Sequence, residues 1–169
     1  MKKIGLLSDT HGYLDDAILN HLANVDEVWH AGDFGPDVAE RLEKFKPMKG
    51  VFGNIDDAAI RKTYPRMLRF MCEELDVLMT HIGGYPGHYE PHMRELIKAN
   101  PPGLFICGHS HILKVMRDPQ HQNLIHINPG AAGKHGFHVM RTLLRFEVNE
   151  STIQNMDVVE LGLRGKSDS

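Results

Sequence analysis

Short apolar runs alternate with amphipathic segments through the first half of the chain, and this alternation restricts the fold more than any other feature. The pattern predicts apolar strands at 4–8, 27–30 and 48–52, with helices between them at 14–23 and 36–45. A strand–helix–strand–helix–strand order indicates a parallel sheet with right-handed crossovers. The chain is therefore expected to have an α/β fold.

The second half begins in the same way and then changes. Residues 75–80 and 104–107 are predicted strands, and a helix is expected at 91–99. Beyond residue 111 the predicted strands follow one another directly, at 113–117, 124–127, 142–148 and 152–159. These four strands predict a second sheet that is mixed and largely antiparallel.

No linker, internal repeat or low-complexity tract divides the 169 residues, a length that fits one domain. We predict a single domain over 1–161. The final segment, 162–169, has no apolar periodicity beyond Leu163 and is expected to fray.

Composition and charge argue against several classes of protein. The formal net charge is −3 and the basic residues are scattered, so no extended nucleic-acid surface is predicted. Cys72 and Cys107 form no CxxC pair, which argues against a zinc knuckle and fits reduced cytosolic thiols. The apolar run at 4–7 is too short for a signal sequence or a membrane span. A cytoplasmic location without membrane insertion is expected.

Five predicted strands end at short polar motifs. These are Asp9-Thr10-His11, Gly32-Asp33, Gly53-Asn54, Thr80-His81 and Gly108-His109-Ser110-His111. Ligand sites of open α/β sheets lie beyond the carboxyl ends of the strands, so the five motifs are expected to converge on one crevice. One residue separates the two candidate ligands in the first and the last motif, and an extended backbone would point both to the same side. A glycine before three of the ligands permits sharp turns and close approach.

The candidate ligands indicate a pair of metal ions. Imidazole, carboxylate and amide groups without a thiolate suit Mn, Fe, Ni, Zn or Mg and select none of them. Seven ligands exceed the three that one catalytic metal commonly uses, and they suit two metals about 3.5–4 Å apart. Asp9, Asp33 and a bridging hydroxide would offset three of four positive charges. Neutral Asn54 would preserve the remaining charge for a phosphate ester.

In this order the motifs resemble the calcineurin-like metallophosphoesterase superfamily, whose signature is D-x-H, GD, GN, H and GHxH. The resemblance spans roughly residues 4–148, and Ile127-Asn128-Pro129-Gly130 resembles a strand-turn of its small single-domain phosphodiesterases. It implies a four-layer αββα sandwich with two mixed β-sheets and a metal site at one edge. Asp9, His11 and His111 would hold one metal; Asn54, His81 and His109 would hold the other; Asp33 would bridge them.

The resemblance also implies a reaction: a hydroxide bridging two divalent metals hydrolyses a small phosphodiester, with Asp33, Asn54 and His81 as catalytic residues. Manganese is the first metal expected. A small phosphoester is the expected partner, and a homo-oligomer is left open. The alternatives are a phosphomonoesterase and a catalytically weak scaffold of the same fold. An intact ligand set favours the enzyme.

One position departs from the superfamily pattern. Many members follow the asparagine of the GN motif with a histidine that protonates the leaving oxygen, but this chain has Ile55. The site would then favour leaving groups that need little protonation, or use another acid such as His135 or His138. These two histidines are candidate substrate-binding residues, although exposed surface positions explain them more simply.

Three further residues remain open at this point. Asp56 could support a ligand or cap a helix. Asn128 could support a ligand loop or only form a turn. His30 could contact the site or be a buried, hydrogen-bonded histidine.

Overall fold

The computed structural model describes residues 1–165. The alternating N-terminal segments form two helices and three strands of a five-stranded sheet, which two strands from the C-terminal part of the chain complete. The elements are β1 (Lys2–Leu7), α1 (Asp16–His21), β2 (Glu27–His30), α2 (Val38–Phe45), β3 (Met48–Gly50), β9 (Met140–Asn149) and β10 (Thr152–Leu163). The strand order is β10-β9-β1-β2-β3. The three N-terminal strands run parallel, and β9 and β10 are antiparallel to their neighbours.

The middle of the chain forms a second five-stranded sheet with two more helices. Its elements are α3 (Ala58–Thr63), β4 (Met67–Cys72), β5 (Leu75–Thr80), α4 (Pro91–Ala99), β6 (Leu104–Ile106), β7 (Leu113–Asp118) and β8 (Leu124–Pro129). The strand order is β4-β5-β6-β8-β7, with parallel pairs in the centre and antiparallel pairs at both edges. No helix within residues 1–165 is both long and apolar enough to cross a bilayer.

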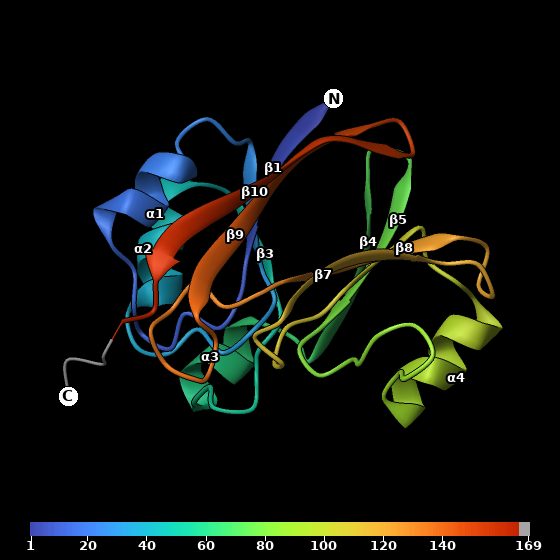
Figure 1. Cartoon of the computed structure of the whole chain (residues 1–169), viewed down its shortest axis with the longest axis horizontal. Helices are drawn as coiled ribbons and strands as arrows, with labels where there is room; N and C mark the ends of the chain where they lie inside the picture. The colour runs from blue at the N-terminus through green and yellow to red at the C-terminus, as the bar shows by residue number, and fades with distance from the viewer. Residues whose placement is uncertain (166–169) are drawn as a thin grey trace.

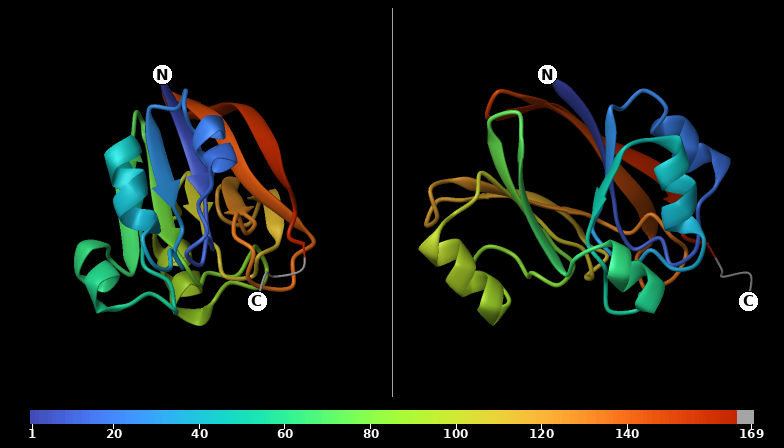
Figure 2. Two further views of the ribbon diagram at one scale, coloured as in Figure 1. Left: turned by 90° about the vertical axis from the view of Figure 1, so that its left-hand side faces the viewer. Right: turned by 180° about the vertical axis from the view of Figure 1, so that it is seen from behind.

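The two sheets pack against each other, and helices cover their outer faces (Figure 1, Figure 2). Ile4, Trp29 and Phe146 of the first sheet share one apolar cluster with Val77 and Ile127 of the second. A separate cluster joins α1 and α2 to the first sheet, and a third joins α4 to the second. The layers are therefore helix, sheet, sheet and helix, which confirms the predicted α/β fold and αββα sandwich.

Two details of the predicted topology are wrong. β9 and β10 belong to the first sheet, where β9 lies beside β1 and places Phe146 opposite Ile4. The second sheet is not largely antiparallel either, because both pairs made by β6 are parallel. An alternating pattern shows which face of a strand is buried, but it does not show which strand lies next to it. Strands that are consecutive in sequence are thus divided between the two sheets.

Two short elements are absent from the sequence-based prediction. β4 is an edge strand with exposed Met67 and Met71, and α3 buries no side chain, so neither shows a clear apolar period. β10 also extends into the segment expected to fray, because Gly162 and Leu163 still pair with β9. Leu161 packs against the core and holds this end of the strand. Residues 166–169 of that segment lie outside the described residues.

Candidate metal centre

The five polar motifs meet at one edge of the molecule, beyond the carboxyl ends of strands from both sheets. The Asp9 amide donates to the Gly32 carbonyl over 3.0 Å, which joins the turns after β1 and β2. In the second sheet the Gly108 amide donates to the His81 carbonyl over 3.0 Å. The sheets are linked where the His109 amide donates to Oδ2 of Asp9 over 3.1 Å. The predicted convergence is therefore present in the structure.

The candidate ligands form two groups, in each of which the ligand atoms lie within 4.8 Å of one another. The Asp9 group consists of Asp9, His11 and His111, and the Asp33 group consists of Asp33, His81 and His109. Asn54 stands beside the Asp33 group, with its Oδ1 3.0 Å from Nδ1 of His109. All seven residues that the sequence selects as ligands are thus brought together.

The two groups adjoin each other through their carboxylates. Nε2 of His11 lies 3.7 Å from Oδ1 of Asp9 and 3.5 Å from Oδ2 of Asp33. Nε2 of His81 lies 3.1 Å from the same Asp33 oxygen and 3.8 Å from the same Asp9 oxygen. Both carboxylates therefore lie between the two sets of imidazoles, as a pair of neighbouring cations would require.

The backbone at the ligand pairs is not extended, contrary to the assumption made from the spacing. The φ angles are 54° at Asp9, 45° at His11, 72° at His109 and 62° at His111. These left-handed conformations turn the chain sharply at the strand end, where an extended strand would carry it past the site. Asp9 and His11 still share one group, but His109 and His111 belong to different groups.

Glycines make room for the ligand side chains. A Cβ on Gly32 would lie 2.6 Å from Nδ1 of His81. A Cβ on Gly53 would overlap Oδ1 of Asp33, and one on Gly108 would lie 2.8 Å from Oδ2 of Asp9. Each glycine therefore admits a ligand from a different motif, which a larger residue would displace.

The electrostatics of the site keep both carboxylates ionised. Burial opposes ionisation of Asp9, but contacts with His11 and His111 outweigh burial and hold the pKa of Asp9 far below its usual range. Burial likewise opposes ionisation of Asp33, and its close contact with the His81 imidazole outweighs that effect and lowers the pKa of Asp33. For His81, the two carboxylates outweigh burial and raise the imidazole pKa.

The unpaired atoms of the site fit divalent cations. Nε2 of His11 and Nε2 of His81 are buried, and neither has a hydrogen-bond partner within residues 1–165. The Ala31 carbonyl accepts a hydrogen bond from Nδ1 of His81 over 2.7 Å, so Nε2 of that ring carries the lone pair toward the centre. Ionised carboxylates beside free imidazole nitrogens suit several divalent metals and do not select one.

Asp56 ties two ligand-bearing turns together. Its carboxylate accepts hydrogen bonds from the amides of Phe34, Gly35 and Gly53 over 2.9–3.2 Å. The residue that caps α3 is Asp57, whose Oδ1 accepts from the Ile60 amide. Of the two roles left open for Asp56, the structure shows support of the turns that carry Asp33 and Asn54.

Asn128 supports the turn that carries His109 and His111. Its Nδ2 donates to the Gly108 carbonyl and to Oγ of Ser110, both over 3.0 Å, and its Oδ1 accepts from the Gly130 amide. Its role therefore exceeds that of a turn residue.

His30 lies behind the site and is fully buried. Its Nδ1 accepts a hydrogen bond from the Gly32 amide over 3.1 Å, and its Nε2 lies 3.0 Å from Oγ1 of Thr10. Burial lowers the pKa of His30 to about 3, so the ring is neutral. Ser8, which the sequence analysis does not select, donates to Oδ2 of Asp9 over 2.6 Å. Its only sequence signal is its position immediately before a candidate ligand.

Both ligand groups open into a cavity of about 520 Å³, called here the histidine cleft. Asn54, Ile55 and the loop at 135–138 complete its walls. The His135 ring centroid lies 4.7 Å from that of His11. Nε2 of His138 donates to the Gly133 carbonyl over 2.8 Å, while its Nδ1 is buried without a partner in the described residues. The two histidines selected from the sequence as candidate substrate-binding residues therefore line the cavity of the candidate metal centre.

Several solved structures share this fold. The chain is 22% identical to an archaeal phosphodiesterase, with 93% of this chain and 99% of that one covered and a TM-score of 0.70. For a predicted phosphoesterase from Streptococcus pneumoniae the identity is 21%, the coverage 95% and 90%, and the TM-score 0.66. Vps29 from Entamoeba histolytica, solved with Zn²⁺, is 13% identical, with coverage of 95% and 99% and a TM-score of 0.71.

The TM-scores establish the common fold, and the family follows from the match of the sequence to a family model. A search of curated proteins gives no match. The sequence model of the calcineurin-like phosphoesterase superfamily domain matches residues 1–151, which include every candidate ligand and both histidines of the loop at 135–138. The chain therefore belongs to the calcineurin-like phosphoesterase superfamily.

Proposed function

We propose that this chain is a metal-dependent hydrolase of small phosphodiesters that uses two divalent cations. The observation that carries the proposal is the pair of adjoining ligand groups, with Asp9 and Asp33 between two sets of imidazoles. A single cation would leave one of these groups unused. The family match and the archaeal phosphodiesterase of the same fold support the same class of reaction.

In this proposal Asp9, His11 and His111 would hold one cation, Asn54, His81 and His109 would hold the other, and Asp33 would be shared between them. When bound, such cations lower the pKa of a coordinated water and offset the charge on a phosphoryl group. The chain itself orients the ligands: Ser8 fixes Asp9, the Ala31 carbonyl fixes His81, and Asp56 fixes the turns of Asp33 and Asn54. Manganese is the first metal to test.

The preference for a diester rests on position 55. Ile55 is 48% exposed and lines the histidine cleft, where it can neither donate a proton nor bind an anionic oxygen. The exposed Asn54 amide, at the boundary of the Asp33 group, is placed to donate to a phosphoryl oxygen. We assign His135 and His138 to substrate contact because both line the same cleft. A small phosphoester acted on in the cytoplasm completes the proposal.

The test compares two substrates and two variants. Purified protein loaded with Mn²⁺ should hydrolyse bis(4-nitrophenyl) phosphate more efficiently than 4-nitrophenyl phosphate. Asp33→Asn should reduce diester kcat/KM by about 10²–10³-fold, the usual loss when one electrostatic stabiliser of a transition state is removed. Asp37→Asn is the matched control, because Asp37 is exposed in the same loop region and its side chain makes no capping hydrogen bond.

Two results would overturn this proposal. Faster turnover of the monoester would replace a phosphodiesterase with a phosphomonoesterase. A protein inert with Mn²⁺, Fe²⁺, Ni²⁺, Zn²⁺ and Mg²⁺ would favour a scaffold, a role to which exposed Ile112, Phe137 and Val139 beside the cleft would be suited.

A further inference from the structure

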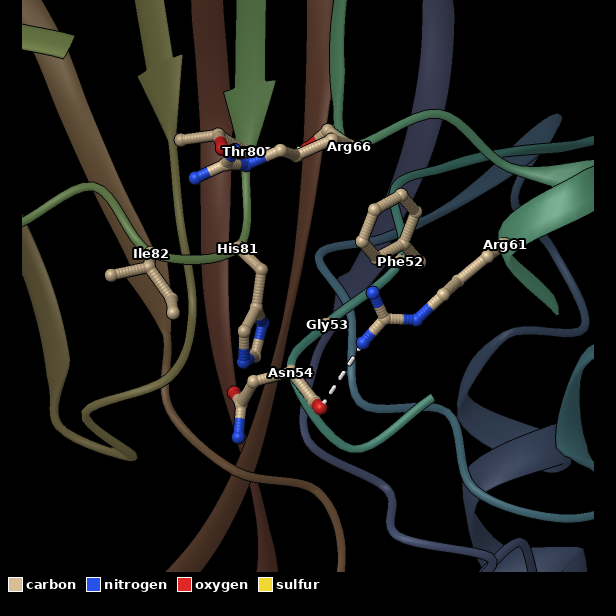
Figure 3. A pocket seen from close by; sticks show the side chains of 8 residues that line it. All are labelled: Phe52, Gly53, Asn54, Arg61, Arg66, Thr80, His81 and Ile82. Atoms are coloured by element: carbon tan, nitrogen blue, oxygen red, sulfur yellow. Dashed lines mark hydrogen bonds between the residues drawn. The ribbon is translucent and has the colours of Figure 1, made fainter. Parts of the chain in front are cut away.

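A second cavity adjoins the candidate metal centre and shares Asn54 with the histidine cleft. It has a volume of about 280 Å³ and is called here the arginine pocket. Figure 3 shows its walls, which include Phe52, Arg61, Arg66 and Ile82. Asn54 and His81 also line it, so the pocket reaches the Asp33 group. A molecule held at the metal centre could therefore extend into this pocket.

The charge of the pocket is positive. Arg61 and Arg66 contribute two guanidinium groups, and no aspartate or glutamate lines the pocket. Within residues 1–165 no carboxylate oxygen lies within 4.0 Å of a side-chain nitrogen of either arginine. Both residues are exposed, and the guanidinium fork matches the geometry of carboxylate and phosphate groups. Two arginines without a carboxylate partner therefore leave room for an external anion.

The two arginines are held differently. Nε of Arg61 donates to the Asp56 carbonyl over 2.8 Å, and a second nitrogen donates to the Asn54 carbonyl over 3.3 Å. The guanidinium also lies 4.6 Å from the centre of the Phe52 ring. Figure 3 shows the bond to the Asn54 carbonyl, by which Arg61 holds the turn of a candidate ligand. The same bonds keep its positive charge in a fixed place in the pocket wall.

Arg66, unlike Arg61, is not held in place by hydrogen bonds of its guanidinium within residues 1–165. In Figure 3 its side chain crosses above the pocket near Thr80, and in the described residues its guanidinium makes no hydrogen bond. Only its backbone is engaged, where the Arg66 carbonyl accepts from Oγ1 of Thr80 over 3.4 Å. All donors of this guanidinium are therefore available to a bound anion.

The histidine cleft provides the contrast. Although it is larger, at about 520 Å³, it is lined by no lysine or arginine and includes apolar Ile55, Ile112 and Phe137. Asn54 lies in the walls of both cavities. A phosphodiester has two ester arms, and a phosphoryl group beside Asn54 would direct one arm toward each cavity. The two arms would then meet surfaces of different charge.

Resting on the proposed phosphodiesterase function, we propose that the arginine pocket binds an ester arm that carries its own negative charge. The substrate class is a phosphodiester with one anionic arm and one uncharged arm. Arg66 donates to the anion, Arg61 adds a fixed charge, and Phe52 and Ile82 contact the carbon skeleton of the arm. The uncharged arm occupies the histidine cleft.

The test uses two 4-nitrophenyl phosphodiesters that differ only at the end of the second arm, a carboxylate in one and a carboxamide in the other. Wild-type protein with Mn²⁺ should show a lower KM for the carboxylate by at least about tenfold, the range of one charge-assisted hydrogen bond. This preference should shrink as ionic strength rises. Arg66→Gln should remove most of the preference and leave only the part due to the charge of Arg61, and Arg66→Lys should keep more of it.

Lys62→Gln is the matched control. Lys62 is exposed on α3 beside Arg61, carries the same charge and does not line the pocket, so the ratio of the two KM values should be unchanged. Metal content of each variant shows that the centre is intact.

The outcomes separate the two proposals. Equal KM values in the wild type, or a preference that is undiminished in Arg66→Gln, would overturn the arginine-pocket proposal and leave the hydrolase intact. Inertness toward both diesters with every divalent metal would remove the hydrolase proposal and this one with it.

Discussion

The Asp9 group and the Asp33 group contain the same donors, one carboxylate and two imidazoles, but the protein encloses them differently. Asp9 is completely buried, and its Oδ2 accepts hydrogen bonds from Ser8 and from the His109 amide. Asp33 is also buried, but its group includes His109, whose side chain is exposed, and it borders the arginine pocket. The Asp9 group therefore opens into the histidine cleft alone, whereas the more exposed Asp33 group faces both cavities.

This difference has a consequence for metal affinity. Ligands that are buried and already hydrogen-bonded lose little further freedom when a cation binds, so the Asp9 group should bind its metal more tightly. The open Asp33 group should bind more weakly and leave coordination positions for substrate. Two unequal affinities are expected from a site whose ligand chemistry is nearly symmetric.

The largest expected effect tests this inequality directly. Asp9→Asn removes a buried carboxylate between imidazoles, and losing one partner of a buried charge pair costs about 3–5 kcal/mol. The tighter affinity for Mn²⁺ should therefore fall by roughly 10²-fold or more. His109→Ala should weaken only the second binding event. Calorimetric titration of metal-free protein measures both affinities, and an equal loss of both in the two variants would contradict the comparison.

Much of this site could be predicted from the sequence because its ligands follow strand ends. Apolar runs identify the strands, and the polar motif after each run marks the edge where parallel strands bring residues together. Local pattern thus predicts Asp9, Asp33 and His81 as neighbours, although they are far apart along the chain. The same pattern carries no information on the left-handed turns at Asp9 and His11, because side-chain spacing does not determine φ.

Features that depend on long-range partners could not be predicted. β9 shows the alternation of a strand, but only the complete fold places it beside β1. Asp56 has the sequence of a helix cap, but two of its three partners, Phe34 and Gly35, belong to a turn about twenty residues away. Arg61, Arg66 and Ile82 line the arginine pocket together only because the fold brings separate segments of the chain side by side.

A smaller effect is expected from a change to Asp56, which holds the turns of the Asp33 group in place. Asp56→Asn replaces an acceptor of three backbone amides and should weaken metal binding at the Asp33 group by about 10–100-fold, the usual range for residues that hold metal ligands. Asp57→Asn is the control, because asparagine also caps a helix well and should change metal binding little. Metal titrations of the two variants decide the point. Equal affinities in both would show that Asp56 does not position the Asp33 group.

The smallest expected effect concerns the charge of the Asp33 group and of Asn54 beside it. Asn54→Asp would add a negative charge beside His109 without removing an oxygen ligand. Two like charges about 4 Å apart in water repel by about 1 kcal/mol, and Asn54 is exposed, so the KM for an anionic diester should rise about fivefold. The added carboxylate should also strengthen metal binding. KM is therefore compared between wild type and variant at full metal occupancy, so that only the charge differs. If KM stays unchanged at full metal occupancy, the neutrality of Asn54 does not preserve charge for the substrate. The exposure of the Asp33 group would then only give the substrate access to the metal, without adding an attractive charge.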